Sequence, residues 1–320
     1  MSDTVWLWVG FNVFVLAMLA LDLGVFHRHS HVVGFKEAAA WSVVWVLLAC
    51  AFGLGLYWFH PGGQQASIEF FTGYLIEKSL SIDNIFIFVL IFTSFAVPAA
   101  YQHRVLFWGI LGALLMRGFF IAVGSWMLEQ FHWIIYVFGA FLIVTGIKMG
   151  LERERKMEVE GNAVVKLARR FLPLTDGYRG DRFFSRDAGR LMATPLFVVL
   201  ILVETTDLIF AVDSIPAIFA VTRDPFLVYT SNVFAILGLR SLYFLLGGVV
   251  DRFHLLKIGL AIVLCFVGVK MLLVETAWKV PTVWSLVVIG AVIGGSIVLS
   301  LVFPKAAVEV VEPEHPVIEG

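Results

Sequence analysis

Long apolar stretches recur along this chain and are separated by short polar connections. Nine of the stretches contain about 18 residues or more, enough to cross the hydrocarbon core of a bilayer as a helix. They cover residues 5–26, 40–59, 69–98, 104–127, 132–150, 194–222, 227–248, 256–275 and 281–303. The pattern predicts an all-α, polytopic membrane protein with about nine transmembrane helices.

The composition favours this class and excludes a soluble globular domain. Of the 320 residues, 60% are hydrophobic and 15% are charged, whereas about a quarter of the residues in a soluble domain are charged. The two cysteines, Cys50 and Cys265, lie inside apolar stretches without CxxC spacing, which indicates neither a disulfide framework nor a dithiol redox motif. We interpret both as small buried hydrophobic residues.

The distribution of Lys and Arg over the connections predicts the orientation of the chain, because positive residues are retained on the cytoplasmic side. With the N-terminus outside, the inside connections hold 17 of the 23 basic residues. The outside connections hold three, which are Arg223, Lys270 and Lys279. The prediction is an external N-terminus and a cytoplasmic C-terminus.

An internal repeat relates the two sides of a long polar segment. Three short segments match in the same order: residues 81–85 with 211–215, 110–112 with 236–238, and 146–149 with 268–271. Each copy contains three apolar stretches, which is an odd number, so the second copy enters the membrane from the opposite face. Inverted repeats of this kind are typical of transporters whose binding site lies near the membrane midplane.

This organisation divides the chain into five parts. They are two N-terminal transmembrane helices at 1–68, a first three-helix repeat at 69–150, a cytoplasmic loop at 151–193, a second three-helix repeat at 194–277, and the last transmembrane helix with a cytoplasmic tail at 278–320. We therefore expect a core of two inverted three-helix repeats.

Ionisable residues are concentrated in two of the apolar stretches, 69–98 and 194–222. A charge at bilayer depth costs at least about 2.5–3.5 kcal/mol on insertion scales, and such residues usually face a cavity, a partner or a permeating ion. The candidate metal ligands are Glu77, Asp83, Asn84, Glu204, Asp207, Asp213 and Ser214. Their oxygen atoms suit Mg²⁺, Ca²⁺ or Mn²⁺, whereas Zn²⁺ and Cu²⁺ usually recruit thiolate or imidazole.

The spacing of these residues raises a geometric question. On a straight helix, Glu77 and Asn84 share one stripe, and Asp207 and Ser214 form the corresponding stripe. The remaining acids, Asp83 and Asp213, point well away from those stripes, which predicts local unwinding of the helices or a cavity wide enough to be lined from two directions. Pro216 favours unwinding in the second copy, because it cannot donate to the carbonyl of Val212.

The alternative to a metal site is a set of internal salt bridges that fix helix packing. Three basic residues lie within the spans, namely Lys78, Arg117 and Arg240, and we assign them as structural counter-ions. Five intramembrane acids against these three bases leave an excess of two, which one divalent cation would neutralise.

Several segments resemble the TerC family of membrane proteins, and especially its Alx-like branch. They are GYLIEKSLSIDNIFIF, LVETTDLIFAVDSIPAIFAVT, TSNVFAILGLR and GVKMLL. The resemblance implies a multi-spanning protein of the bacterial inner (plasma) membrane, in the LysE-like transporter group, linked in several members to manganese export. It also implies that the acidic motifs of the family fall on the seven candidate ligands.

The expected function is efflux of Mn²⁺ through an acid-lined site between the inverted repeats, with protons as a candidate coupling ion. We expect a lipid bilayer and a metal cation as partners, no nucleic acid, no bound cofactor and no enzymatic activity. Two alternatives stay open, which are a membrane-bound redox modulator and a non-transporting partner in membrane-protein insertion or metalation. The choice of cation among Mn²⁺, Ca²⁺ and Mg²⁺ also stays open.

Overall fold

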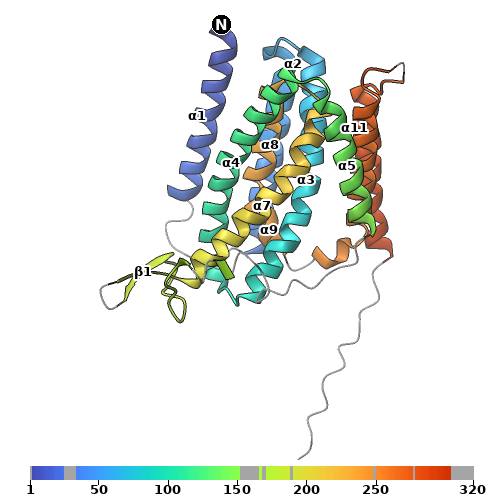
Figure 1. Cartoon of the computed structure of the whole chain (residues 1–320). Helices are drawn as coiled ribbons and strands as arrows, with labels where there is room; N and C mark the ends of the chain where they lie inside the picture. Colours follow the sequence, from blue (N-terminus) through green and yellow to red (C-terminus); the bar gives the residue numbers. More distant parts are fainter. Residues whose placement is uncertain are drawn as a thin grey trace, which may run out of the picture.

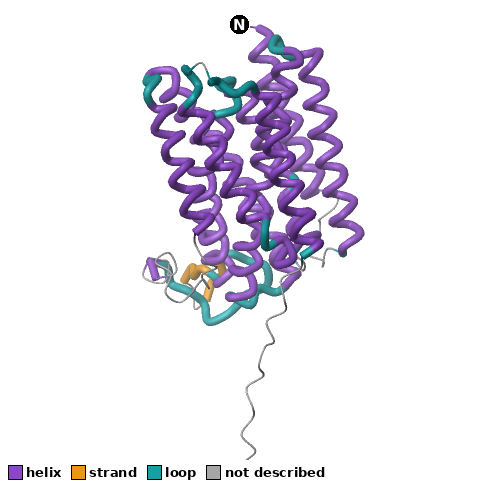
Figure 2. Tube along the Cα trace, turned by 90° about the vertical axis from the view of Figure 1, so that its right-hand side faces the viewer, coloured by secondary structure: helices purple, strands orange, loops and turns teal. Residues whose placement is uncertain are grey.

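The computed structural model describes residues 2–24, 34–151, 166–167, 171–187, 190–247, 250–276 and 278–303. Within these residues the chain forms a bundle of long helices that run roughly side by side, with most connections gathered at the two ends (Figure 2). The expected C-terminal tail and much of the expected cytoplasmic loop lie outside the described residues.

The helices before the polar segment follow the predicted apolar stretches closely (Figure 1). They are α1 (Ser2–Gly24), α2 (Phe35–Phe59), α3 (Gly63–Ser94), α4 (Ala99–Gln130) and α5 (Ile134–Leu151). The elements after it are α7 (Pro195–Phe219), α8 (Pro225–Leu237), α9 (Leu239–Leu246), the 3-10 helix η1 (Val250–Phe253), α10 (Leu256–Leu272) and α11 (Thr282–Val302). Each of the nine predicted stretches therefore lies mainly in helix.

Six helical segments among the described residues are long and apolar enough to cross a membrane. They are α2, α4, α5, α7, the combined segment Pro225–Leu246 and α11. Helix α1 contains a shorter apolar stretch, Val5–Ala20, α10 has only 17 residues, and α3 carries the buried charges. The multi-helix membrane class is supported, and the count of nine spans stays a prediction.

The centre of the bundle is formed by α3, α4, α7 and α8. Helix α3 packs against α7 and α8, and α4 packs against the same two helices from another side. Many of the outward side chains are large and apolar, for example Leu115, Val144 and Trp284, as expected for a surface that faces lipid. Polar residues are therefore enclosed in the middle of an apolar shell.

Helices α5 and α10 pack along each other over much of their length. Glycines make this close approach possible: a Cβ on Gly268 would lie 2.7 Å from the carbonyl oxygen of Gly139, and one on Gly146 would lie 2.7 Å from Cys265 Sγ. Small residues at such contacts are typical of membrane helices. The matched segments 146–149 and 268–271 thus begin with glycines of one shared interface, while the inverted-repeat relation itself stays a prediction.

Part of the predicted loop is folded against the end of the bundle that lies opposite the N-terminus (Figure 1). It contains an antiparallel pair, β1 (Phe184–Asp187) and β2 (Arg190–Ala193), which the all-α expectation did not include. Arg104 Nη1 of α4 lies 2.7 Å from Asp181 Oδ2. The Tyr178 hydroxyl donates to the carbonyl of Phe95 at 2.7 Å, and burial raises the pKa of Tyr178 to about 12, so this donor stays protonated.

Candidate functional site

Arg117 of α4 is enclosed at the point where the four central helices meet. Its Nη1 donates to Glu77 Oε1 of α3 and, at 2.6 Å, to Asn232 Oδ1 of α8. Its Nη2 donates to Asp207 Oδ1 of α7 at 3.2 Å. The side chain of Arg117 is only 2% exposed, and those of Glu77 and Asp207 are 1% and 4% exposed. One guanidinium therefore ties together side chains from three other helices.

Two neutral groups complete this arrangement. Asn84 Nδ2 donates to Asp207 Oδ1 at 3.5 Å, and Ser214 Oγ lies 3.5 Å from Arg117 Nη1. We call the set the central cluster, and its members are Glu77, Asn84, Arg117, Asp207, Ser214 and Asn232. Helices α3 and α7 each present two of these residues, seven positions apart, on one face, because seven residues make nearly two full turns.

Several oxygen atoms of the central cluster point into the interior with no hydrogen-bond partner among the described residues. They are Glu77 Oε2, Asp207 Oδ2 and Asn84 Oδ1. Buried acceptors without donors are costly, and carboxylate oxygens are especially so. With both acids ionised, their charge exceeds that of Arg117 by one. The donor set therefore has the charge and the spare lone pairs to accept a hard cation.

The predicted unwinding at the acids is wrong. Helix α3 runs without a break from Gly63 to Ser94, and α7 runs without a break from Pro195 to Phe219 with Pro216 inside it. Pro216 lies in the last turn of α7, where its own carbonyl still accepts from the amide of Ala220 at 3.1 Å. A proline so close to a helix end removes one hydrogen bond without opening the helix at the acids.

Asp83 and Asp213, which we call the outer acids, lie on another face of the same two helices. Asp213 Oδ1 accepts from Thr145 Oγ1 of α5 at 3.3 Å, and the charge of Lys148 also acts on it. Asp83 interacts electrostatically with Lys257 at the start of α10. The outer acids therefore face the α5 and α10 pair.

The seven predicted ligands consequently do not converge on one point. Glu77, Asn84, Asp207 and Ser214 join the central cluster, and the outer acids do not. Within the described part of the chain, no three residues of the types His, Cys, Asp and Glu are grouped closely enough to form a ready metal site. The metal role of the seven residues stays a prediction.

Glu204, the seventh predicted ligand, lies one turn before Asp207 on α7. Its carboxylate packs against Gly112 of α4, where an added Cβ would force the Glu204 side chain to move. Its Oε2 is buried without a hydrogen-bond partner among the described residues. The glycine of the predicted match at 110–112 thus accommodates a buried acid.

Lys78 differs from Arg117 in its surroundings. Lys78 Nζ donates to the carbonyl of Ala235 at 3.4 Å, beside the bend at Gly238 where α8 ends and α9 begins. A Cβ on Gly238 would lie 2.7 Å from this Nζ. The hydrogen bond of Lys78 thus goes to the main chain, whereas Arg117 has the acid partners expected of a counter-ion.

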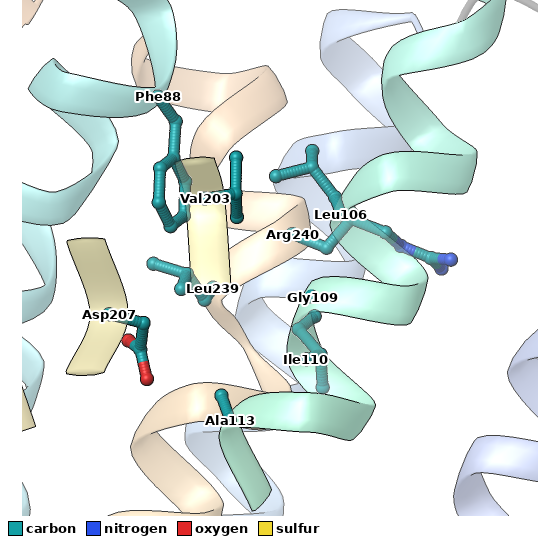
Figure 3. A pocket seen from close by; sticks show the side chains of 9 residues that line it. All are labelled: Phe88, Leu106, Gly109, Ile110, Ala113, Val203, Asp207, Leu239 and Arg240. Carbon is teal, nitrogen blue, oxygen red and sulfur yellow. The ribbon is translucent and has the colours of Figure 1, made fainter. Parts of the chain in front are cut away.

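A small, mostly apolar pocket adjoins the central cluster (Figure 3). It is lined by Phe88, Leu106, Gly109, Ile110, Ala113, Val203, Asp207, Leu239 and Arg240. Figure 3 shows the carboxylate of Asp207 at one edge, while the guanidinium of Arg240 points away from it. A second pocket, next to Trp41 and Trp45 of α2, also includes Arg240. Arg240 therefore contributes to the lining of both pockets.

Sequence reasoning missed Asn232, the fully buried acceptor for Arg117. A signal was present, because Ser231 and Asn232 form a polar pair inside the apolar stretch 227–248. Buried amides in an apolar helix need partners just as charges do. Considering polar uncharged residues in every apolar stretch, beyond the two that carry the acids, would have pointed to α8 as the fourth wall of the site.

Comparisons with known proteins agree with this picture of a membrane-embedded helical bundle. The protein family described as "Integral membrane protein TerC family" matches residues 62–307 of this chain. The chain is 57% identical over 301 residues to "Uncharacterized membrane protein STKORF319" of Myxococcus xanthus, covering 94% of this chain and 93% of that protein. It is 50% identical over 290 residues to "Putative membrane-bound redox modulator Alx" of Escherichia coli strain K12, covering 88% of this chain and 90% of the relative.

The relative of that name in Shigella flexneri matches to the same extent, with 50% identity over 290 residues, 88% of this chain and 90% of the relative. No solved structure gives a significant match. Because the family match covers most of the chain and the relatives align over nearly their whole length, the chain belongs to the TerC family of integral membrane proteins.

Proposed function

We propose that this protein is a transporter that carries a divalent metal cation across the membrane, with outward movement of Mn²⁺ as its reaction. One observation carries the proposal: Glu77, Asp207 and Asn84 each keep a buried oxygen, where the central helices meet, that has no hydrogen-bond partner in the described part of the chain. Ionisable groups at such depth are costly and usually mark the path of an ion. A bound cation would supply the missing partner for all three oxygens.

The chemistry of the central cluster favours hard cations. Its candidate donors are carboxylate, amide and hydroxyl oxygens, which suit Mn²⁺, Mg²⁺ and Ca²⁺. The described part of the cluster contains no thiolate or imidazole, the usual ligands of Zn²⁺ and Cu⁺. An anionic substrate would be repelled by the excess of acids. We therefore assign the substrate to this cation class and place Mn²⁺ first within it.

In the empty site each acid of the central cluster uses one oxygen for Arg117 and keeps the other for an incoming metal, to which Asn84 and Ser214 add neutral oxygens. Each outer acid lies about 9 Å further along its own helix at 1.5 Å per residue. Because the predicted repeats are inverted, Asp83 and Asp213 serve as one stop for the cation on each side of the central cluster. Movement of the two predicted repeats against each other would open the site to either side in turn. The predicted inner membrane, external N-terminus and proton coupling belong to the same proposal.

Flux into proteoliposomes tests the proposal directly. The purified protein is reconstituted alone and presented with Mn²⁺, Mg²⁺ or Ca²⁺, with and without a pH gradient. We expect uptake of at least one of these cations, and loss of that uptake in Glu77→Gln and Asp207→Asn. Asp181→Asn, which alters only the ion pair with Arg104 at the bundle end, is the matched control. Absence of divalent flux in well-folded protein would contradict the proposal.

The name that two relatives carry, "Putative membrane-bound redox modulator Alx", favours a second candidate function, that of a membrane-bound redox modulator. Both cysteines of this chain are free and only partly buried, and each lies in a different helix. A redox role would therefore need a bound redox group. The absorbance spectrum of the purified protein decides between the candidates, because a bound flavin or haem would be visible at once.

A further inference from the structure

We infer that Arg117 is an internal counter-cation, which takes the place of the metal between Glu77 and Asp207 when the transporter is empty and so permits its return without cargo. The inference rests on the proposed function and adds to it the way in which the empty site is neutralised. It assigns to Arg117 a part in the transport cycle, beyond the fixing of helix packing.

The position of the guanidinium is the first observation. Its two terminal nitrogens bond to carboxylates on two different helices, Glu77 on α3 and Asp207 on α7. These are the helices that carry all seven predicted ligands. A divalent cation that bridges the same two carboxylates would occupy the same space, so it can enter only as the guanidinium withdraws from at least one of them.

The incomplete bonding of Arg117 is the second observation. Its Nε is buried and has no hydrogen-bond partner among the described residues, although buried guanidinium groups are usually fully bonded. Asn232 Oδ1, a neutral acceptor, lies 2.6 Å from Nη1. This amide offers the guanidinium an anchor that does not compete with a metal, because it stays available when the acids turn to the cation.

Charge is the third observation. In the empty site the two ionised acids and Arg117 sum to one negative charge. Without Arg117 the empty site would hold two negative charges on side chains that are 1% and 4% exposed. Enclosing two uncompensated carboxylates in an apolar bundle is strongly unfavourable. An empty transporter that lacks this arginine would therefore be trapped until a metal returns to the site.

Metal affinity gives the first test. In Arg117→Gln the competitor for the carboxylates is removed, so Mn²⁺ should bind purified protein about tenfold more tightly or better, as measured by calorimetric titration. Arg104→Gln, which removes an arginine from the exposed ion pair with Asp181, should leave the affinity unchanged. Equal or weaker binding to folded Arg117→Gln would show that the arginine merely positions the acids, and would overturn the inference.

The transport mode gives the second test. Proteoliposomes are assayed for net Mn²⁺ efflux and for exchange of labelled Mn²⁺ at equal concentrations on both sides. The parent protein should perform both. Arg117→Gln should keep exchange within about threefold, because every crossing then carries metal, while net efflux falls about tenfold or more. Net efflux at the parental rate, or an equal loss of both modes in folded protein, would overturn the inference.

A further variant keeps the inference testable if Arg117→Gln fails to fold. Arg117→Lys retains the charge and should retain net efflux. If Arg117→Lys folds and exchanges Mn²⁺ without net efflux, charge compensation is not the role of Arg117. Failure of the proposed function is distinguishable, since the parent itself would then show neither mode.

Discussion

On α3 and α7, the acids of the central cluster and the outer acids are only six residues apart, yet their surroundings differ. Glu77 and Asp207 are enclosed and share a buried guanidinium. Asp83 and Asp213 are half-buried, and Asp213 bonds to a hydroxyl while the charges of Lys257 and Lys148 act from neighbouring helices. Acids of the same two helices thus share a buried, hydrogen-bonded guanidinium in one place and have looser charge compensation in the other.

The comparison teaches that helix phase decides the role of each acid. Six residues advance the face of a helix by 240°, so each outer acid turns toward α5 or α10 instead of the centre. A buried acid pair without countercharge would destabilise the bundle, which explains why the guanidinium is found at the enclosed position. The predictions below test this difference, beginning with the largest expected effect.

Removal of Arg117 should affect stability most. We expect Arg117→Met to lower the free energy of unfolding of the metal-free protein by about 3–5 kcal/mol, because two buried carboxylates lose their partner. Thermal unfolding in detergent measures the change, and Mn²⁺ should recover part of it. Lys257→Met, the matched change beside an outer acid, should have a much smaller effect. Similar losses of stability in both variants would show that the central cluster and the outer acids depend equally on their countercharges.

Neutralising single acids should show that the central cluster contributes more to metal affinity than the outer acids do. We expect Glu77→Gln or Asp207→Asn to weaken Mn²⁺ binding by about 100-fold, since an enclosed charged ligand is lost, whereas Asp83→Asn or Asp213→Asn weakens it by less than about tenfold. Calorimetric titration of the parent and the four variants gives the change in the dissociation constant for Mn²⁺. If the outer acids proved the more important, the main site would lie between α3, α7 and the α5 and α10 pair.

Crowding the contact between α5 and α10 should disturb the outer acids and spare the central cluster. Gly268→Val places atoms against the backbone of Gly139, and overpacking of this kind costs about 1–3 kcal/mol. Gly294→Ala is the control, because its added Cβ would meet nothing within 4 Å. Thermal unfolding measures the loss of stability in Gly268→Val, and Mn²⁺ titration measures whether the central cluster is spared. An unchanged unfolding temperature would show that α5 and α10 separate easily.

The smallest effect is expected from the hydroxyl partner of an outer acid. Thr145→Val removes the donor to Asp213 Oδ1, and the loss of one such hydrogen bond costs about 0.5–1.5 kcal/mol. Unfolding in detergent at two salt concentrations measures the change. A loss as large as that of Arg117→Met would mean that Asp213 is as tightly enclosed as Asp207.

Sequence patterns predicted much of the fold and part of the site. The positions of the helices follow from apolar length, and the stripe of Glu77 with Asn84 follows from helical periodicity. The expected unwinding failed because Pro216 lies in the last turn of α7, where one lost hydrogen bond is tolerated. Asn232 was missed because neutral polar residues were considered only in the two acid-bearing stretches, and Asn232 lies in the stretch 227–248. The hairpin was missed because its short strands lie in a polar segment.

The sequence by itself determined the membrane class, the order of the helices, the two acid-bearing helices and the face on which each acid lies, because these properties depend on local composition and helical geometry. Only the tertiary structure decided which faces meet. It brings Arg117 and Asn232, from helices α4 and α8, to Glu77 and Asp207, and it turns the outer acids toward α5 and α10. The physical reason is that a buried charge selects its partner by distance in space, which no local pattern records.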